Sequence, residues 1–216
     1  MKLIWPSYEI LTSIDGSEIL KTIELAGRTC YKSECRITDD SAAKFVKMLV
    51  GNHHLSVIEH VSLSVRFIVD RGISHELVRH RICSISQEST RYIRHDRGVT
   101  FIIPSWLDLD PTELDSADTQ WLLMDDYESE TWVWMQSMAR SEQAYLDLLE
   151  RGWSPQQARS VLPNSLKTEL VVTANLREWR HILEMRCAFA AHPQMREVML
   201  PLRDQLRREI PVVFDY

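Results

Sequence analysis

Val61-Ser62-Leu63-Ser64-Val65-Arg66-Phe67-Ile68-Val69 is the stretch that decides the fold. Its odd-numbered positions are all apolar, and its even-numbered positions are polar until Ile68. This period of two predicts a strand with one buried face and a second face that is only partly polar. Asp70-Arg71-Gly72 follows at once and predicts a turn, after which a short helix delivers Arg79, His80 and Arg81.

Amphipathic segments on both sides of this strand predict helices. The first predicted helix covers residues 17–26 and ends at Gly27. The second begins at Thr38-Asp39-Asp40 and ends at Gly51. The others are the long run Trp121–Leu149 and residues 178–186 and 194–208. Ser154-Pro155-Gln156-Gln157 has a cap residue, a first-turn proline and a box glutamine in the right order to begin another helix. The remaining segments are a short extended piece within 98–107, an exposed acidic loop over 108–120, and a strand or a helix over 166–173.

We therefore predict an α+β fold, with a central antiparallel or mixed sheet flanked by helices, one of them long. The 216 residues suffice for one domain over 1–216, and 44% apolar with 26% charged residues is ordinary for a globular protein. No apolar run reaches the roughly eighteen residues of a membrane span, and Met1–Pro6 does not begin a signal peptide. We expect a cytoplasmic protein whose four cysteines are free, with a Cys30–Cys35 disulfide as the alternative.

Arg79-His80-Arg81-Ile82-Cys83-Ser84-Ile85-Ser86-Gln87-Glu88-Ser89-Thr90-Arg91-Tyr92 is the stretch most typical of a binding site. Arginine forks and hydroxyl groups together suit phosphate and other planar anions. No lysine occurs between Lys47 and Lys167, and the net charge is −6, so we expect no nucleic-acid partner. A discrete anionic ligand is the preferred interpretation, and a set of surface ion pairs is the alternative.

Three groups of residues permit more than one chemistry. His53, His54 and His60 flank Glu59, but their spacing matches no common metal pattern, so we predict no metal and expect ligand contacts at a sheet edge. Cys83 lies among arginines and is either a nucleophile or a packing residue.

Arg186 is the third ambiguous position. It sits among apolar neighbours, and such an arginine must find a partner or line a cavity. A structural ion pair with Glu178 or Glu184 is the alternative to a functional role.

Four motifs in the same order resemble those of the flavin-dependent thymidylate synthases. Arg79-His80-Arg81, seven residues and then Ser89 reproduce the R-H-R-x7-S signature of that family. The companion motifs are His54-x-Ser56-x-x-Glu59-His60, Arg159-x-x-Leu162-Pro163, and Asn175-x-Arg177 followed by Arg186. The resemblance covers about residues 50–200.

The resemblance implies a homotetramer that holds FAD, with active sites at subunit interfaces. The family methylates dUMP to dTMP with carbon from 5,10-methylenetetrahydrofolate and reducing equivalents from NADPH, and it uses no enzyme nucleophile. The FAD contacts implied are Ser56, Arg79, His80, Arg81, Gln87, Asn175, Arg177 and His181. The dUMP contacts implied are Glu76, Arg79, Gln87, Glu88, Ser89, Thr90, Arg91, Arg159 and Arg186.

Two further roles follow from the same resemblance. His54 and Tyr92 are expected near the folate or flavin face, and Arg186 is expected to stabilise the ionised uracil ring. Gln87 stands where the family often has Glu, and Glu76 where it often has Gln; we assign His192 no role. A nucleotide-binding module without catalysis and an arginine-rich RNA-binding protein remain the alternative hypotheses.

Overall fold

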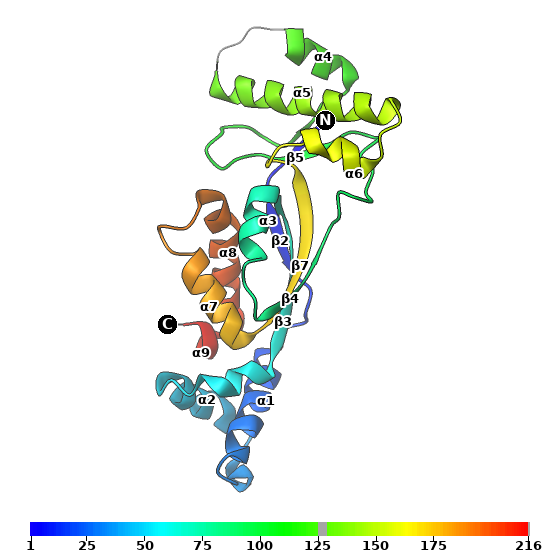
Figure 1. Cartoon of the computed structure of the whole chain (residues 1–216). Helices are drawn as coiled ribbons and strands as arrows, with labels where there is room; N and C mark the ends of the chain where they lie inside the picture. The colour runs from blue at the N-terminus through cyan, green and yellow to red at the C-terminus, as the bar shows by residue number, and fades with distance from the viewer. Residues whose placement is uncertain (125–128, 216) are drawn as a thin grey trace. The chain divides into compact units, whose positions relative to one another are not determined.

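The structure is a computed structural model that describes residues 1–124 and 129–215. Its helices and strands follow one another along the chain as the colour gradient of Figure 1 shows. In the element names, η denotes a 3-10 helix. The elements are β1 (Lys2–Ile4), β2 (Ser7–Ile10), α1 (Gly16–Thr29), η1 (Glu34–Arg36), α2 (Ser41–Gly51), η2 (Leu55–His60), β3 (Ser62–Asp70), α3 (Arg71–Leu77), β4 (Cys83–Gln87), β5 (Thr100–Ile102), β6 (Thr112–Glu113), α4 (Ser116–Met124), α5 (Glu130–Glu150), α6 (Pro155–Ala158), η3 (Arg159–Val161), β7 (Lys167–Asn175), α7 (Leu176–Arg186), α8 (Pro193–Glu209) and α9 (Pro211–Phe214).

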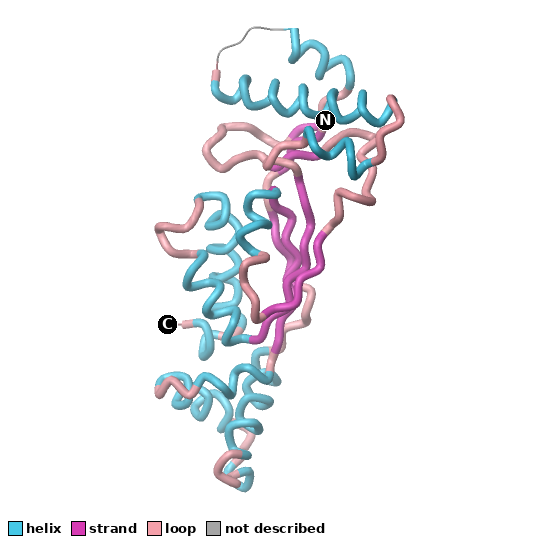
Figure 2. The backbone as a smooth tube through the Cα atoms, in the orientation of Figure 1, coloured by secondary structure: helices cyan, strands magenta, loops and turns pink. Residues whose placement is uncertain are grey.

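The described strands form two sheets. One has the order β2-β3-β7-β4, and its long central strands β3 and β7 are the prominent magenta segments of Figure 2. The other has the order β5-β1-β6, in which β1 is parallel to β5 and antiparallel to β6. Sheets flanked by helices confirm the predicted α+β class, and the 21-residue α5 is a long helix, although it begins later in the chain than predicted.

Strand β3 confirms the period of two in the sequence, since the side chains of Leu63, Val65 and Phe67 are completely buried. Strand β7 settles the ambiguity of 166–173 in favour of a strand, and its burial alternates in the same way. Both strands run directly into helices. Asp70 caps α3 by accepting a hydrogen bond from the Ile73 amide at 2.7 Å, so the turn predicted at 70–72 is wrong.

Contacts between Cα atoms divide the chain into two compact units. The first unit consists of Met1–Ser7, Phe67–Arg79 and Ser86–Leu170, and the second of Tyr8–Arg66, His80–Ile85 and Val171–Tyr216. The single domain expected over 1–216 stays a prediction.

The first unit is built on the β5-β1-β6 sheet with helices α4, α5 and α6. Its core includes Leu3, Phe101 and Tyr145, which are almost fully buried. One helix over Trp121–Leu149 was predicted, and that prediction is wrong. The side chain of Ser129 caps α5 at the Trp132 amide, which sets the start of the helix, and part of the predicted run, 125–128, lies outside the described residues. The predicted acidic loop over 108–120 likewise contains β6 and the start of α4.

The second unit packs α1 against α2 and η2, and α7 against α8. Gly27 was predicted to end the first helix, but α1 continues to Thr29. A Cβ atom at Gly27 would lie 2.9 Å from side-chain atoms of Phe45 and Leu49 on α2, so this glycine allows close helix packing instead. Trp179 of α7 is fully buried and donates its indole N–H to the Leu63 carbonyl, which joins the helix to β3.

Among the described residues, no helix has both the length and the apolar character that a membrane crossing requires.

Candidate active site

A cation-lined cavity in the first unit brings together two of the predicted dUMP residues. Arg159 begins η3, and its Nη1 donates a hydrogen bond to Thr90 Oγ1 at 3.0 Å. The cavity beside this pair has a volume of about 500 Å³. Its lining residues are Arg71, His75, Thr90, Gln156, Arg159, Ser160, Leu162, Pro163, Asn164 and Leu166. No carboxylate is among them, so the described lining favours an anionic ligand.

Arg71 and His75 are residues of this cavity that the sequence analysis missed. They are separated by four positions on α3 and therefore lie on one face of the helix. The signal was present in the sequence as a basic pair at helical spacing. It was missed because Asp70-Arg71-Gly72 was interpreted as a turn, which gives Arg71 no helix face.

Gln87 and Glu88 are held by the sheet at the end of β4. Gln87 Nε2 donates to Ser74 Oγ at 3.0 Å and to Thr168 Oγ1 at 3.2 Å. The Glu88 carboxylate accepts hydrogen bonds from Lys167 Nζ at 3.0 Å and from the Glu169 amide at 3.1 Å.

The ammonium group of Lys167 lies between two carboxylates. Burial lowers the pKa of Lys167, but the hydrogen bonds that its ammonium group donates to the Glu169 and Glu88 carboxylates outweigh burial and raise that pKa overall. Lys167 therefore stays charged, and Glu88 forms a partly buried ion pair with it.

The rest of the predicted nucleotide segment lies at the surface of the first unit. Arg79 is exposed after the end of α3, and Glu76 is half-buried on that helix. Ser89 Oγ accepts a hydrogen bond from the Arg91 amide, while the Arg91 guanidinium lies 5.4 Å from the ring centroid of the exposed Tyr92. None of these residues lines the cavity at Arg159.

In the second unit, η2 and α7 gather several of the predicted flavin residues. Arg177 Nη1 contacts Glu59 Oε1 at 2.6 Å, which ties the start of α7 to η2. Asn175 caps α7 by accepting from the Glu178 amide at 2.9 Å, so its side-chain oxygen already has a structural partner. Ser56 on η2 and His54, the residue just before this helix, are both exposed. Arg81 is exposed as well.

His80 and Arg186, two of the predicted site residues, are in direct contact in the second unit. Arg186 Nε donates a hydrogen bond to His80 Nε2 at 3.0 Å, and the two residues are 106 positions apart in sequence. Burial, followed by the charges of Arg186 and His181, lowers the pKa of His80 to about 4. The ring is therefore neutral at pH 7, and its 3.7 Å approach to Glu178 is not an ion pair under those conditions.

Cys83 belongs to the same neighbourhood as a structural thiol. Its Sγ donates to the His80 carbonyl at 3.0 Å. Burial raises the pKa of Cys83, and the nearby Glu178 charge acts in the same direction. A thiolate is disfavoured there, which supports the prediction that no cysteine attacks the substrate.

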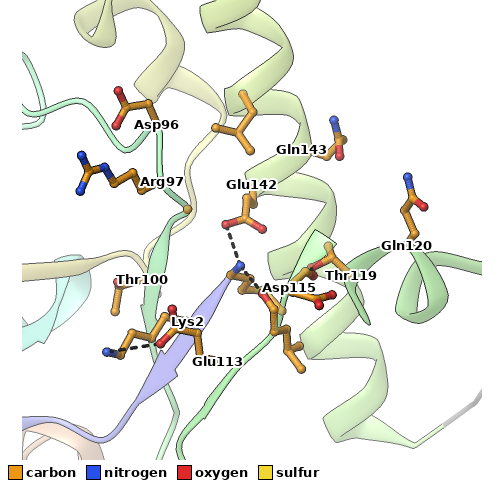
Figure 3. Close-up of a pocket in the computed structure, with 14 residues that line it drawn as sticks. Lys2, Asp96, Arg97, Thr100, Glu113, Asp115, Thr119, Gln120, Glu142 and Gln143 are labelled. Atoms are coloured by element: carbon orange, nitrogen blue, oxygen red, sulfur yellow. Dashed lines mark hydrogen bonds and ion pairs between the residues drawn. The ribbon is translucent and has the colours of Figure 1, made fainter. Parts of the chain in front are cut away.

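A second cavity of the first unit, about 520 Å³, contains none of the predicted site residues (Figure 3). Glu142 of α5 accepts from the Val99 amide at 2.7 Å and pairs with the Met1 amine at 3.2 Å. Lys2 pairs with Glu113 at 3.8 Å. These ion pairs and the hydrogen bond of Glu142 hold the start of the chain and β1 to neighbouring elements. Because these charged groups of the cavity already have partners, we assign this cavity no ligand.

The comparisons with known proteins agree with the motifs. A family model described as "Thymidylate synthase complementing protein" matches residues 12–212. The flavin-dependent thymidylate synthase of Mycobacterium avium (strain 104) is 35% identical over 211 residues, which cover 94% of this chain and 80% of that protein. The chain belongs to the flavin-dependent thymidylate synthase family. The enzyme of the same name from Mycobacterium tuberculosis (strain ATCC 25618 / H37Rv) is 32% identical over 97% of this chain and 83% of its own.

Solved structures support the fold of this family member. A UMP/dUMP methylase, PolB from Streptomyces cacaoi, has a TM-score of 0.76 at 23% identity and covers 100% of this chain and 96% of its own. Thymidylate synthase X from Helicobacter pylori, solved with FAD and dUMP, has a TM-score of 0.74 at 22% identity, with 97% of both chains covered. The family resemblance drawn from the Arg79–Tyr92 signature is thereby confirmed.

Proposed function

We propose that this flavin-dependent thymidylate synthase converts dUMP to dTMP, with 5,10-methylenetetrahydrofolate as carbon donor and NADPH as reductant of FAD. The observation that carries the proposal is the acid-free cavity at Thr90 and Arg159, found in a chain of this family. The reaction needs a site that selects a nucleotide monophosphate, and this cavity has the charge for one.

The cavity beside Arg159 and Thr90 in the first unit is the proposed phosphate site. Arg159 and Arg71 bring fixed positive charges, Thr90 brings a hydroxyl group, and His75 adds a ring nitrogen. Arginine forks form charge-assisted hydrogen bonds with phosphate oxygens, which are about twice as strong as neutral ones. The Arg159–Thr90 hydrogen bond orients the guanidinium group before the ligand arrives.

The η2–α7 region of the second unit is the proposed flavin site. Its exposed donors suit the pyrophosphate and polar ring atoms of FAD, with Ser56 on η2, Arg177 on α7 and Arg81 before β4. When bound, FAD supplies the redox chemistry, so the protein has to bind and orient it. His54, Tyr92 and His181 are exposed polar or aromatic groups that we assign to the flavin or folate face.

Arg186 is the proposed catalytic residue. A fixed guanidinium charge beside the pyrimidine stabilises negative charge that develops on the ring, and it does so best when its position is set in advance. No protein nucleophile is required, which agrees with the protonated, hydrogen-bonded thiol of Cys83.

The remaining assignments complete the proposed site. Glu76, Arg79, Gln87, Glu88, Ser89 and Arg91 are the further dUMP residues, and His80, Gln87 and Asn175 the further FAD residues. We also propose a homotetramer with active sites at subunit interfaces, so that one site draws residues from more than one chain, and we propose a cytoplasmic location.

Purified protein tests the function directly. We expect a yellow protein with flavin absorbance that forms dTMP from dUMP only when both NADPH and methylenetetrahydrofolate are present. UMP serves as the comparison substrate, because its turnover relative to that of dUMP measures how strongly the enzyme selects at the 2′ position. Binding of dUMP without turnover would favour a regulatory module, and a colourless protein without activity would refute the proposal.

A further inference from the structure

Two charged side chains of the second unit, Glu178 and Arg186, contact the two ring nitrogens of His80. Glu178 Oε1 lies 3.7 Å from His80 Nδ1, and Arg186 Nε donates to His80 Nε2 at 3.0 Å on the other side of the ring. The histidine side chain is 6% exposed and that of Glu178 9% exposed, so both nitrogens are largely shielded from water. The ring therefore has one anionic neighbour and one cationic neighbour on opposite nitrogens.

This arrangement selects one form of the neutral histidine. An imidazole that accepts a hydrogen bond at Nε2 must carry its proton on Nδ1. At 3.7 Å the Glu178 oxygen is too distant for a direct hydrogen bond, yet its negative charge favours a proton on the nitrogen that faces it. Removal of that charge would leave His80 free to place the proton on Nε2, which cannot then accept from Arg186.

A metal ion is the competing interpretation of the same cluster. Ligand atoms of His80, Glu178 and His181 all lie within 4.8 Å of one another. A divalent ion there would meet the guanidinium of Arg186 across the His80 ring, and the two positive charges would repel. The hydrogen bond from Arg186 also occupies one of the two histidine nitrogens. The geometry favours positioning of an arginine over metal binding.

We infer that Glu178 and His80 are positioning residues of this enzyme, which hold the Arg186 guanidinium in one orientation through the Nδ1-protonated form of His80. The inference rests on the proposed role of Arg186 at the uracil ring. Neither residue needs to touch the substrate for this role. The negative charge of Glu178 favours the His80 proton on Nδ1, and His80 Nε2 is then always able to accept the hydrogen bond from Arg186.

Glu178→Gln tests the inference with little structural change, because the backbone amide that Asn175 caps is kept. We expect kcat to fall by roughly 10- to 100-fold, the range seen when a residue that orients a functional histidine is lost. The dissociation constant of dUMP should change far less, because the phosphate is held elsewhere. Glu184→Gln is the matched control, on an exposed position of the same helix, and should retain normal turnover.

A double-mutant cycle separates positioning from general damage. In His80→Gln the side-chain oxygen can accept from Arg186 whatever stands at position 178. Adding Glu178→Gln to His80→Gln should therefore have little further effect on kcat. Additive losses would mean that Glu178 acts independently of His80, and the inference would be wrong.

Nitrogen-15 NMR of labelled histidines tests the arrangement without any turnover. We expect His80, identified by the signal missing in His80→Gln, to be neutral and protonated on Nδ1 at pH 7. A proton on Nε2 would overturn the inference even in an active enzyme. Conversely, a chain with the expected Nδ1 signal but no dTMP formation would refute the proposed function and leave the His80 contact intact.

Discussion

The buried neutral His80 makes a quantitative prediction about acid stability. Its pKa is lowered from the ordinary 6.5 to about 4 in the folded protein. A group with a lowered folded pKa stabilises the protein above its unfolded pKa, and that stability is lost as the pH falls toward the folded pKa. The wild-type protein therefore loses stability between pH 6.5 and pH 4 because the unfolded chain binds a proton that the folded ring resists.

The size of the effect follows from the shift. One pKa unit corresponds to about 1.4 kcal/mol, so by pH 4.5 the contribution of His80 amounts to about 2 to 3 kcal/mol. His80→Gln removes the titrating ring and keeps a hydrogen-bond acceptor for Arg186. The difference in unfolding free energy between the two proteins should therefore shift by that amount, in favour of the variant, from pH 7.5 to pH 4.5.

Urea unfolding followed by tryptophan fluorescence at the two pH values measures this difference. Carboxylates titrate in both proteins, so their contribution cancels in the comparison. His60→Gln, at an exposed histidine of the same unit, controls for the loss of any histidine. If the free energies of unfolding of wild type and His80→Gln change equally with pH, His80 does not have a lowered pKa in the folded protein. That result would refute the argument that burial shields the His80–Arg186 contact from water.

Four further predictions concern activity and packing. Arg186→Ala should raise the barrier by about 2.7 to 4 kcal/mol, as loss of an oxyanion-hole donor does, and near-normal kcat would exclude the assigned role. Arg71→Ala should raise the KM for dUMP with little change in kcat, and an unchanged KM would remove Arg71 from the phosphate site. Cys83→Ala should keep substantial activity, since complete loss with flavin still bound would point to a nucleophile. Gly16→Ala should lower the free energy of unfolding by about 1 to 3 kcal/mol, because a Cβ atom there would collide with the Glu209 carbonyl; Gly51→Ala, where space is open, should not.

Local patterns predicted much of the scaffold. The alternation of Val61–Val69 gave β3, and the cap, proline and glutamine of Ser154–Gln157 gave α6 with its capping box. Short strands such as β1 and β4 were not predicted, because three to five residues carry too little periodicity and their pairing is set by distant segments.

The errors came from signals that tertiary packing overrides. Gly27 was interpreted as a helix stop, but it lies inside α1, where its missing side chain accommodates Phe45 and Leu49. The predicted helix over Trp121–Leu149 ignored Ser129, whose hydroxyl begins α5 at a defined point.

The candidate site was predicted in part. The companion motif gave Arg159 and the continuation of the signature gave Thr90, and the structure joins the two by a hydrogen bond. The contact of His80 with Arg186 could not be inferred, because it joins residues 106 positions apart and depends on how α7 packs. A sequence motif indicates which residues belong to a site, but it does not indicate which of those residues contact one another.

One spectroscopic experiment tests most directly whether this chain methylates dUMP with a bound flavin. The absorbance of the purified protein is recorded before and after anaerobic addition of NADPH, and then after dUMP and methylenetetrahydrofolate. Flavin absorbance that bleaches with NADPH and returns as dTMP forms is the predicted result. A protein without flavin absorbance after incubation with FAD, or a bleached flavin that is not reoxidised and yields no dTMP, would contradict the claim.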